Sequence, residues 1–259
     1  MKITVTTIVS MVLALLVFLF GVLYVTNVIR LGQLPELIEV FNLPSFSIIV
    51  GGVFAHVLIS FPPEQLFSSL SRMSLFFAHS KNDTARMEEI IPGIIQWQRE
   101  LRKNKLAAAA GLSEDVDDHF ASFLFTLMAT NYSTEDIKEL GEARITSNFK
   151  KNSSESNIYT ALGNASPAFG MLGTLLGLIV MLQDFQDSGT LGMGLGVALM
   201  TTLYGLSLAQ FLWFPMEKKI INAARQAARR EQLMLDGILL IMQDKPSMYI
   251  KDYLSASIQ

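Results

Sequence analysis

Residues 165–215 read ASPAFGMLGTLLGLIVMLQDFQDSGTLGMGLGVALMTTLYGLSLAQFLWFP, and this stretch decides the fold of the chain. It contains two apolar runs on either side of a short acidic turn, and neither run holds a charged residue. Each run is close to the ~20 residues that a helix needs to cross the hydrocarbon core of a bilayer. We therefore expect two transmembrane helices joined by a turn, in a protein suited to ion passage more than to soluble chemistry.

Both runs carry a face of small or hydroxylated residues at helical spacing. These residues are Ser166, Gly170, Gly173, Thr174 and Gly177 in the first run, and Gly194, Ala198, Thr201, Thr202, Gly205 and Ala209 in the second. Small residues let helix backbones approach closely in lipid, so a packing seam is the simplest interpretation of the glycines and alanines. That interpretation is weaker for the threonines, although a threonine hydroxyl can bond the carbonyl four residues earlier in its own helix.

The composition is that of a membrane protein, because 51% of the residues are hydrophobic and only 17% are charged. Four spans are expected, at about 5–25, 45–61, 159–182 and 191–214. The first is too long for a signal peptide and no small-residue cleavage site follows it, so we expect a retained helix. The absence of cysteine excludes disulfides and thiolate metal sites. A net charge of −3 gives no reason to expect a nucleic-acid partner.

The basic residues predict how the spans are oriented in the membrane. Lys2 precedes the first span, Arg30 is the only basic residue between the first two, and none lies between the last two. Every other basic residue falls between the second and third spans or after the fourth. Both termini and the long middle region are therefore expected in the cytoplasm.

The expected fold is an all-α integral membrane protein with four transmembrane helices. Its parts are two spans, a helical cytoplasmic domain, two further spans and a cytoplasmic C-terminal helix, at residues 1–62, 63–158, 159–214 and 215–259. The middle region shows helical periodicity and no convincing β alternation. We expect Ser113 to be the N-cap of a helix with acids in its first turn. Ser133 and Asp136, or a pair shifted by one residue, form a capping box.

The sequence gives no support to an enzymatic function. It contains no Gly-rich loop after a strand, no P-loop, no G-x-S-x-G and no H-E-x-x-H motif. Glu114, Asp115, Asp117 and Asp118 form an acidic cluster, which is more typical of a solvated helix start than of a metal site. No Asp or Glu lies within the four spans, yet ion-driven machines normally bind their ion at a membrane carboxylate. That carboxylate would have to come from a partner.

The segments SPAFGMLGTLLGL at 166–178 and VALMTTLYG at 197–205, followed by a helix-ending Phe214–Pro215, closely resemble the third and fourth transmembrane segments of the MotA family, the ion-channel subunits of bacterial flagellar stators. The second span extends the resemblance through Asn42, Pro44, Ser45, Gly51, Gly52, Phe61 and Pro62, although the family's usual acid before the proline is missing. His56 stands where small residues are usual, and we expect it to be neutral and bonded to a neighbouring helix. The related TolQ and ExbB proteins have three spans and fit less well.

The resemblance implies a partner and an assembly. MotB-type partners each bring one transmembrane helix with an essential aspartate, and five MotA-like chains surround two such helices. The resemblance therefore implies a homopentamer around a partner dimer in the bacterial inner membrane, with a transported proton or sodium ion and no cofactor. The ring would step around a partner anchored to the cell wall, and the FliG rotor protein would contact the cytoplasmic domain.

Site residues carry over from the family by position. Thr174 and Thr202 match hydroxyls of the ion route, with Thr201 beside them, and Pro167 and Pro215 match the prolines that convey movement to the cytoplasmic domain. The close-packing positions are Gly170, Gly173, Gly177, Ala198 and Gly205. Arg102 and Lys103 fit the basic pair of the rotor contact, but Ala110 and Gly111 stand at its acidic positions, so the nearest acids are Glu114 and Asp115.

Several functions stay open on the sequence alone. The predicted function is a stator subunit that couples proton or sodium flow to flagellar rotation. A MotA-like ring could instead drive gliding, envelope transport or phage defence, or the chain could be a component of a TolQ/ExbB-type proton channel. A self-sufficient channel and a membrane scaffold are the alternatives from other classes. The paired Thr201 and Thr202 lean slightly towards sodium.

Overall fold

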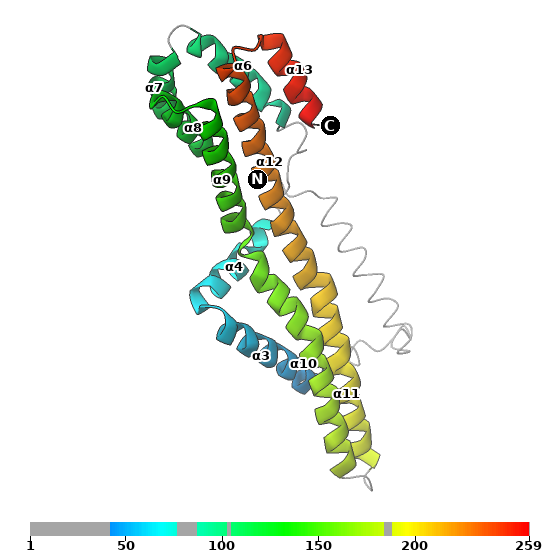
Figure 1. The fold of residues 1–259 in the computed structure, drawn as a ribbon. Helices are drawn as coiled ribbons and strands as arrows, with labels where there is room; N and C mark the ends of the chain where they lie inside the picture. Colours follow the sequence, from blue (N-terminus) through cyan, green and yellow to red (C-terminus); the bar gives the residue numbers. More distant parts are fainter. Residues whose placement is uncertain (1–41, 77–86, 103–104, 184–187, 259) are drawn as a thin grey trace. The chain divides into compact units, whose positions relative to one another are not determined.

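The computed structural model describes residues 42–76, 87–102, 105–183 and 188–258 (Figure 1). The expected span at 5–25 and Lys103 lie outside the described residues. Every regular element within those ranges is helical, which confirms the all-α class. The elements are α3 Leu43–Ser60, α4 Pro63–Phe76, α6 Ile90–Leu101, α7 Lys105–Asp115, α8 His119–Ala129, α9 Thr134–Ser153, α10 Ser156–Gln183, α11 Ser188–Leu208, η1 Ala209–Trp213, α12 Phe214–Met242 and α13 Ser247–Ile258.

The chain divides into two compact units. The first unit combines residues 1–79 with 154–220, and the second combines 80–153 with 221–259. Three described helical stretches are long and apolar enough to cross a membrane: Leu43–Ser60, Thr134–Gln183, which includes α10, and Gly194–Met242, which includes most of α11. The four-span topology and the boundaries of the expected cytoplasmic domain remain predictions.

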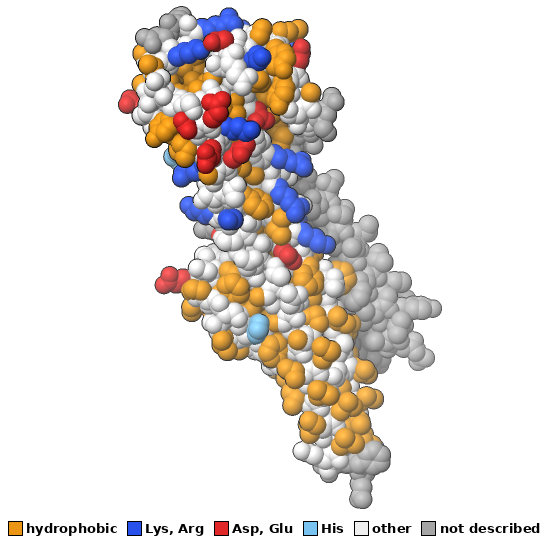
Figure 2. All heavy atoms as spheres, viewed as in Figure 1, with side chains coloured by type: hydrophobic (Ala, Val, Ile, Leu, Met, Phe, Trp, Pro, Cys, Tyr) orange, Lys and Arg blue, Asp and Glu red, His pale blue; other side chains and the backbone are white. Residues whose placement is uncertain are grey.

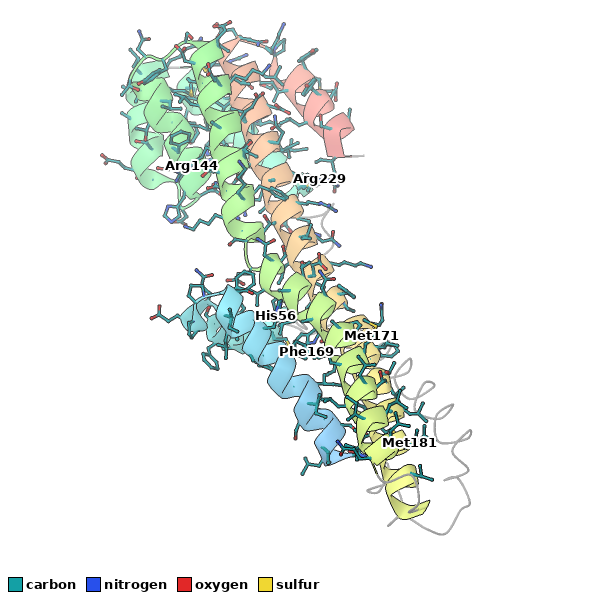
Figure 3. All side chains as sticks on the ribbon, turned by 60° about the horizontal axis from the view of Figure 1, so that its bottom comes forward. His56, Arg144, Phe169, Met171, Met181 and Arg229 are labelled. Carbon is teal, nitrogen blue, oxygen red and sulfur yellow. The ribbon has the colours of Figure 1, made fainter. Side chains whose placement is uncertain are left out.

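Helix α3 packs against α10 and α11, and its sequence explains where it begins and which face it buries. Its N-cap is Asn42, whose side-chain oxygen accepts a hydrogen bond from the Ser45 N–H at 3.0 Å. The buried residues Ser45, Ile49, Val53 and Val57 recur every four positions and so form one face. His56 is exposed on this helix (Figure 3). The expected bond between its ring and a neighbouring helix is not seen within the described residues.

Helices α10 and α11 lie side by side (Figure 1). The prediction that the second of these helices ends at Phe214–Pro215 is wrong. It passes through a π-helical turn, η1, and continues as α12 to Met242. Proline has no N–H, and its ring clashes with the carbonyl four residues earlier. A π turn adds one residue to the turn and moves that carbonyl aside, which is why the helix continues through Pro215. The Phe214 N–H bonds the Ala209 carbonyl across this turn.

The second unit has a core formed by α6, α7, α8, α9, α12 and α13. The prediction that Ser113 is an N-cap is wrong. Ser113 lies inside α7, and its hydroxyl donates to the Ala110 carbonyl at 2.7 Å. The N-cap of the next helix is Asp118, whose carboxylate accepts from the N–H groups of Phe120 and Ala121. The capping box at Ser133 and Asp136 is confirmed, since each side chain bonds the backbone N–H of the other.

Candidate functional site

The small-residue faces of α10 and α11 pack directly against each other. A methyl group on Gly177 would lie 2.6 Å from the Gly194 carbonyl oxygen and 2.7 Å from the Ala198 nitrogen. One on Gly205 would lie 2.5 Å from the Ser166 carbonyl oxygen. Both obstacles are backbone atoms, which cannot move aside as a flexible side chain can. Glycine is therefore required for the two backbones to approach this closely.

Thr201 lies inside this seam. Its side chain is fully buried and occupies the space that a side chain on Gly173 would need, with its Cγ2 only 2.4 Å from where a Cβ on that glycine would lie. Its hydroxyl contacts two carbonyls of its own helix, Val197 at 3.0 Å and Ala198 at 2.9 Å. Thr201 thus fills and shapes the seam, and its hydroxyl is satisfied within α11.

The other two threonines lie at the margins of the seam. Thr174 is half-buried, and its hydroxyl donates to the Met171 carbonyl at 2.6 Å. Thr202 is also half-buried, with its Cα 3.3 Å from where a Cβ on Gly170 would lie. Its hydroxyl makes no hydrogen bond within the described part of the chain. Of the three hydroxyls, that of Thr202 is the one that makes no hydrogen bond within the described residues.

The outward faces of these helices are apolar. Figure 2 shows hydrophobic side chains spread over the first unit, and Figure 3 marks Met171 and Met181 on α10. The exposed large side chains on α10 and α11 are Met171, Leu172, Leu175, Leu176, Leu178, Ile179, Val180, Leu182, Leu195, Leu199 and Leu206. Neither helix holds an Asp or Glu. The described residues also contain no group of His, Cys, Asp or Glu that could hold a metal ion.

The two expected coupling prolines are connected through their neighbours. Pro167 lies inside α10 and cannot donate to the carbonyl of Gly163, four residues earlier. Gly163 packs on the ring of Phe214, the residue before Pro215. A Cβ added to Gly163 would lie only 2.6 Å from Cε1 of that ring. Each helix is thus weakened where it touches the other, which suits a place of bending.

The expected rotor-contact residues belong to the second unit. Arg102 is the C-cap of α6, and Glu114 and Asp115 end α7. All three side chains are exposed. The acids therefore end one helix, whereas the sequence placed them at the start of another. Ala110 and Gly111 are exposed on α7 as well.

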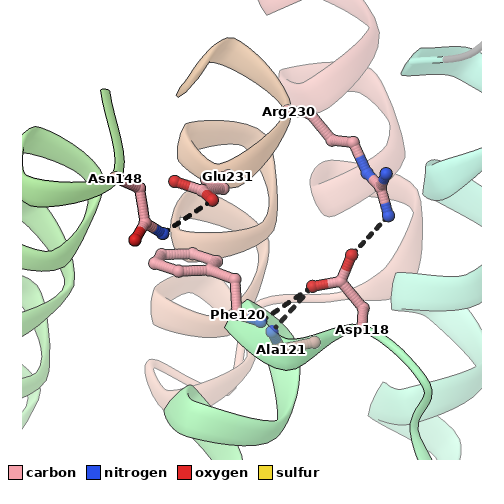
Figure 4. A network of polar contacts seen from close by, with 6 residues as sticks. All are labelled: Asp118, Phe120, Ala121, Asn148, Arg230 and Glu231. Carbon is pink, nitrogen blue, oxygen red and sulfur yellow. Dashed lines mark hydrogen bonds and ion pairs between the residues drawn. The ribbon is translucent and has the colours of Figure 1, made fainter. Parts of the chain in front are cut away.

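A polar network in the second unit was not expected from the sequence (Figure 4). The Asn148 side-chain amide donates to Glu231 Oε1 at 2.8 Å, and Arg230 pairs with Asp118. Glu231 Oε2 is buried and has no hydrogen-bond partner among the described residues. Burial raises the pKa of the Glu231 carboxyl, against the hydrogen bond from Asn148, which lowers it. The sequence spacing could have predicted that Glu231 is partly buried. Glu231 lies seven residues, or about two helical turns, from the buried Ala224 and from the buried Ile238, and so shares their face of α12.

Comparisons with known proteins agree with this architecture. Residues 109–232 match the model of the MotA/TolQ/ExbB proton channel family. The chain is similar to Motility protein A of Bacillus subtilis, with 26% identity over 82% of this chain and 78% of that protein. It is also similar to Chemotaxis protein PomA of Vibrio alginolyticus, with 26% identity over 82% of each chain, and to Motility protein A of Aquifex aeolicus, with 28% identity over 81% and 82%.

Two solved structures share the fold. The structure of C. jejuni MotAB matches with a TM-score of 0.78 and 19% identity, covering 99% of this chain and 96% of that one. The flagellar MotAB stator complex from Bacillus subtilis matches with a TM-score of 0.73 and 24% identity, covering 91% and 92%. Its glycine seam, its charge-free apolar helices and this similarity over most of its length make the chain similar to the MotA/TolQ/ExbB proton channel family, whose model matches residues 109–232.

Proposed function

We propose that this chain is a MotA-like subunit of a flagellar stator, which couples inward flow of protons or sodium ions to rotation. The observation that carries the proposal is the similarity to motility proteins, which runs through about four fifths of the chain and through both units. The family is one of channels and not of enzymes.

The partner is proposed from the chemistry that α10 and α11 lack. An ion crossing the membrane needs a site that binds and releases it, and that site is normally a carboxylate. The described helices α3, α10 and α11 contain none. The two structural relatives are MotAB assemblies. We propose a MotB-like single-span partner that supplies a membrane aspartate, with two such helices enclosed by five copies of this chain.

Thr202 is proposed as the residue of this chain that meets the ion. Its unused hydroxyl could replace part of an ion's hydration shell or hold a water beside the partner's carboxylate. Thr174 would contribute from α10, and Thr201 would fix the backbone on which Thr202 sits. The seam residues Gly170, Gly173, Gly177, Ala198 and Gly205 would hold α10 and α11 in register.

The remaining elements of the proposal concern topology and coupling. We place four spans in the bacterial inner membrane with both termini in the cytoplasm, and the cytoplasmic domain at residues 63–158 together with the helix that follows Pro215. Pro167 and Pro215 would convey membrane movement to that domain. Arg102, Lys103, Glu114 and Asp115 would contact a FliG-like rotor protein.

A complementation experiment tests the proposal. The chain and its single-span partner are expressed in the host of origin after deletion of the chromosomal copies, and swimming is measured. We expect swimming to be lost on deletion and restored by the pair but not by either protein alone. A deletion strain that swims normally, with the chain present in the membrane of the parent, would contradict a flagellar role.

A non-flagellar energiser is the second candidate. The exposed Ala110 and Gly111 favour it, because flagellar members are expected to carry rotor-pairing acids at these positions. Reversing the charges of Arg102 and Lys103 together discriminates the two. Loss of swimming with normal membrane assembly supports the rotor contact, while unchanged swimming means that the contact lies elsewhere or that no flagellar rotor is involved.

A further inference from the structure

Two buried polar groups of the first unit have no hydrogen-bond partner among the described residues. They are the indole nitrogen of Trp213, on η1, and the hydroxyl of Ser69, on α4. The two residues are only 6% and 1% exposed. Native proteins leave few buried polar groups unpaired, because each such group has lost its water without replacement. One is a donor, and the other can accept, so the two are complementary.

Tyr159 contacts both of these residues and shares one hydrophobic cluster with Trp213. Its phenol donates to the Ser69 carbonyl at 2.7 Å, and its ring centroid lies 6.4 Å from that of Trp213. Tyr159 is itself fully buried. Residues of α4, α10 and η1 therefore meet at Tyr159, so a change in the direction of the indole would alter how the unpaired donor faces the unpaired acceptor.

The backbone at Trp213 can supply such a change. Trp213 is the last residue of the π turn that precedes Pro215. A π turn holds one more residue than an α turn, and α-helical geometry advances about 100° and 1.5 Å per residue. Moving the π turn by one position thus rotates the side chains that it passes. The direction of the indole depends on where the turn sits.

We propose that Trp213 and Ser69 are a switched pair: in a second state of the first unit, reached when the η1 turn shifts along the helix, the indole N–H donates to the Ser69 hydroxyl. The inference rests on the proposed function, since it assigns the pair to the working cycle of the stator. Upstream, Gly205 packs tightly against the backbone of α10. In this proposal, a movement at Thr202 is taken up in η1. Downstream, the same helix continues as α12. Trp213 and Ser69 are therefore positioning residues for coupling and do not touch the ion.

Motility of five variants tests the pairing. Trp213→Phe keeps the ring and removes the N–H, and Ser69→Ala removes the acceptor. Each should reduce swimming speed about two- to tenfold, the range for one net hydrogen bond, and the double variant should be no slower than the slower single variant. Trp97→Phe is the matched control in the second unit, and Ser68→Ala is the neighbouring control, because its hydroxyl bonds only the Gln65 carbonyl. Membrane levels of all variants are measured alongside.

A spectroscopic measurement separates switching from static packing. Trp97→Phe leaves Trp213 as the only tryptophan, so ultraviolet resonance Raman spectra report the hydrogen bonding of one indole N–H. The chain is reconstituted with its partner in liposomes, with and without a proton or sodium gradient. We expect a hydrogen-bonded population to appear with a gradient and to vanish in Ser69→Ala.

The outcomes are distinguishable. Wild-type swimming in both single variants, strictly additive losses, or an indole band that is the same with and without either gradient would each overturn the switched pair. If the wild-type chain does not support swimming at all, the flagellar function fails. The Raman comparison then decides the switched pair by itself, because it needs no rotor.

Discussion

At the scale of single residues, two adjacent threonines have opposite environments. Thr201 is fully buried with its hydroxyl bonded to its own helix, whereas the half-buried Thr202 has a hydroxyl that makes no bond within the described residues. Their neighbouring positions in sequence make each a control for the other. Sequence spacing grouped them on one face, since neighbouring residues on a helix differ by only about 100° in direction. Only packing against Gly173 and Gly170 distinguishes them.

Thr202→Val tests the ion route. The substitution keeps the shape of the side chain and removes the hydroxyl, so packing is nearly unchanged. Loss of a hydrogen bond to a charged group costs roughly 1.5–3 kcal/mol, which corresponds to about a tenfold or greater loss of ion-driven swimming. Thr201→Val, the control, should lose much less, because its hydroxyl serves only α11. Equal swimming of Thr202→Val and wild type, at equal membrane levels, would remove Thr202 from the ion route.

Glu231 predicts a pH dependence of stability in the second unit. Burial raises the pKa of its carboxyl, and Asp118 adds to the rise, while Asn148, Arg144 and Arg230 lower it. The folded state therefore binds the proton more tightly than the unfolded state. The contribution of the Glu231 carboxyl to stability is complete below its pKa in the unfolded state, about 4.3. This contribution is lost as the pH rises through its raised pKa in the folded state.

Glu231→Gln should remove this dependence, since an amide keeps the position of the oxygen that Asn148 bonds and carries no charge. Melting temperature, measured at pH 5 and pH 8, should fall less between the two for the variant than for the wild type. Glu139→Gln is the control, because Glu139 is exposed on α9. An identical fall in all three proteins would show that the buried carboxyl does not govern stability.

At the scale of elements, the sequence predicted α10 and α11 well because length, apolarity and small-residue spacing all pointed to the same structure. It did not predict the π turn, because Pro215 is compatible with either a helix end or a bulge, and packing of Phe214 on Gly163 accompanies the bulge. It also placed an N-cap at Ser113 instead of Asp118. Both residue types cap helices, and only the bonds to Phe120 and Ala121 decide between them.

The α10–α11 seam predicts different results for two glycines of similar appearance. Gly177→Ala places a methyl group 2.6 Å from the Gly194 carbonyl oxygen, so we expect a loss of about 1–3 kcal/mol, typical of overpacking. Gly196→Ala is the control, since no atom lies within 4 Å of its added Cβ. Thermal stability of the detergent-solubilised protein measures both. A Gly177→Ala protein as stable as the control would mean that the two helices can separate without cost.

At the scale of the whole molecule, two features support the proposed partner: the apolar outer faces of α10 and α11, and the absence of Asp and Glu from the described helices α3, α10 and α11. Exposed leucines on α10 and α11 suit lipid or other subunits, and in lipid the association of helices depends on close packing and polar contacts. The sequence predicted the need for a partner because its apolar spans hold no Asp or Glu. The described helices α10 and α11 hold none either. The number of copies could not be read from spacing, because a glycine face serves equally within a chain or between chains. Here the glycines of the α10–α11 seam, such as Gly177 and Gly205, are used within the chain.

Ion flux measured with and without the partner tests that dependence. We expect liposomes containing this chain alone to pass neither protons nor sodium above background, because α3, α10 and α11 offer only hydroxyls and backbone carbonyls. Flux should appear when the single-span partner is added and vanish again when its membrane aspartate is changed to asparagine, which has nearly the same size but no charge. Native mass spectrometry of the same preparations should give five copies of this chain with two of the partner. Flux from the chain alone would establish a self-sufficient channel and would require an ion site built from Thr174, Thr202 and backbone carbonyls without any carboxylate.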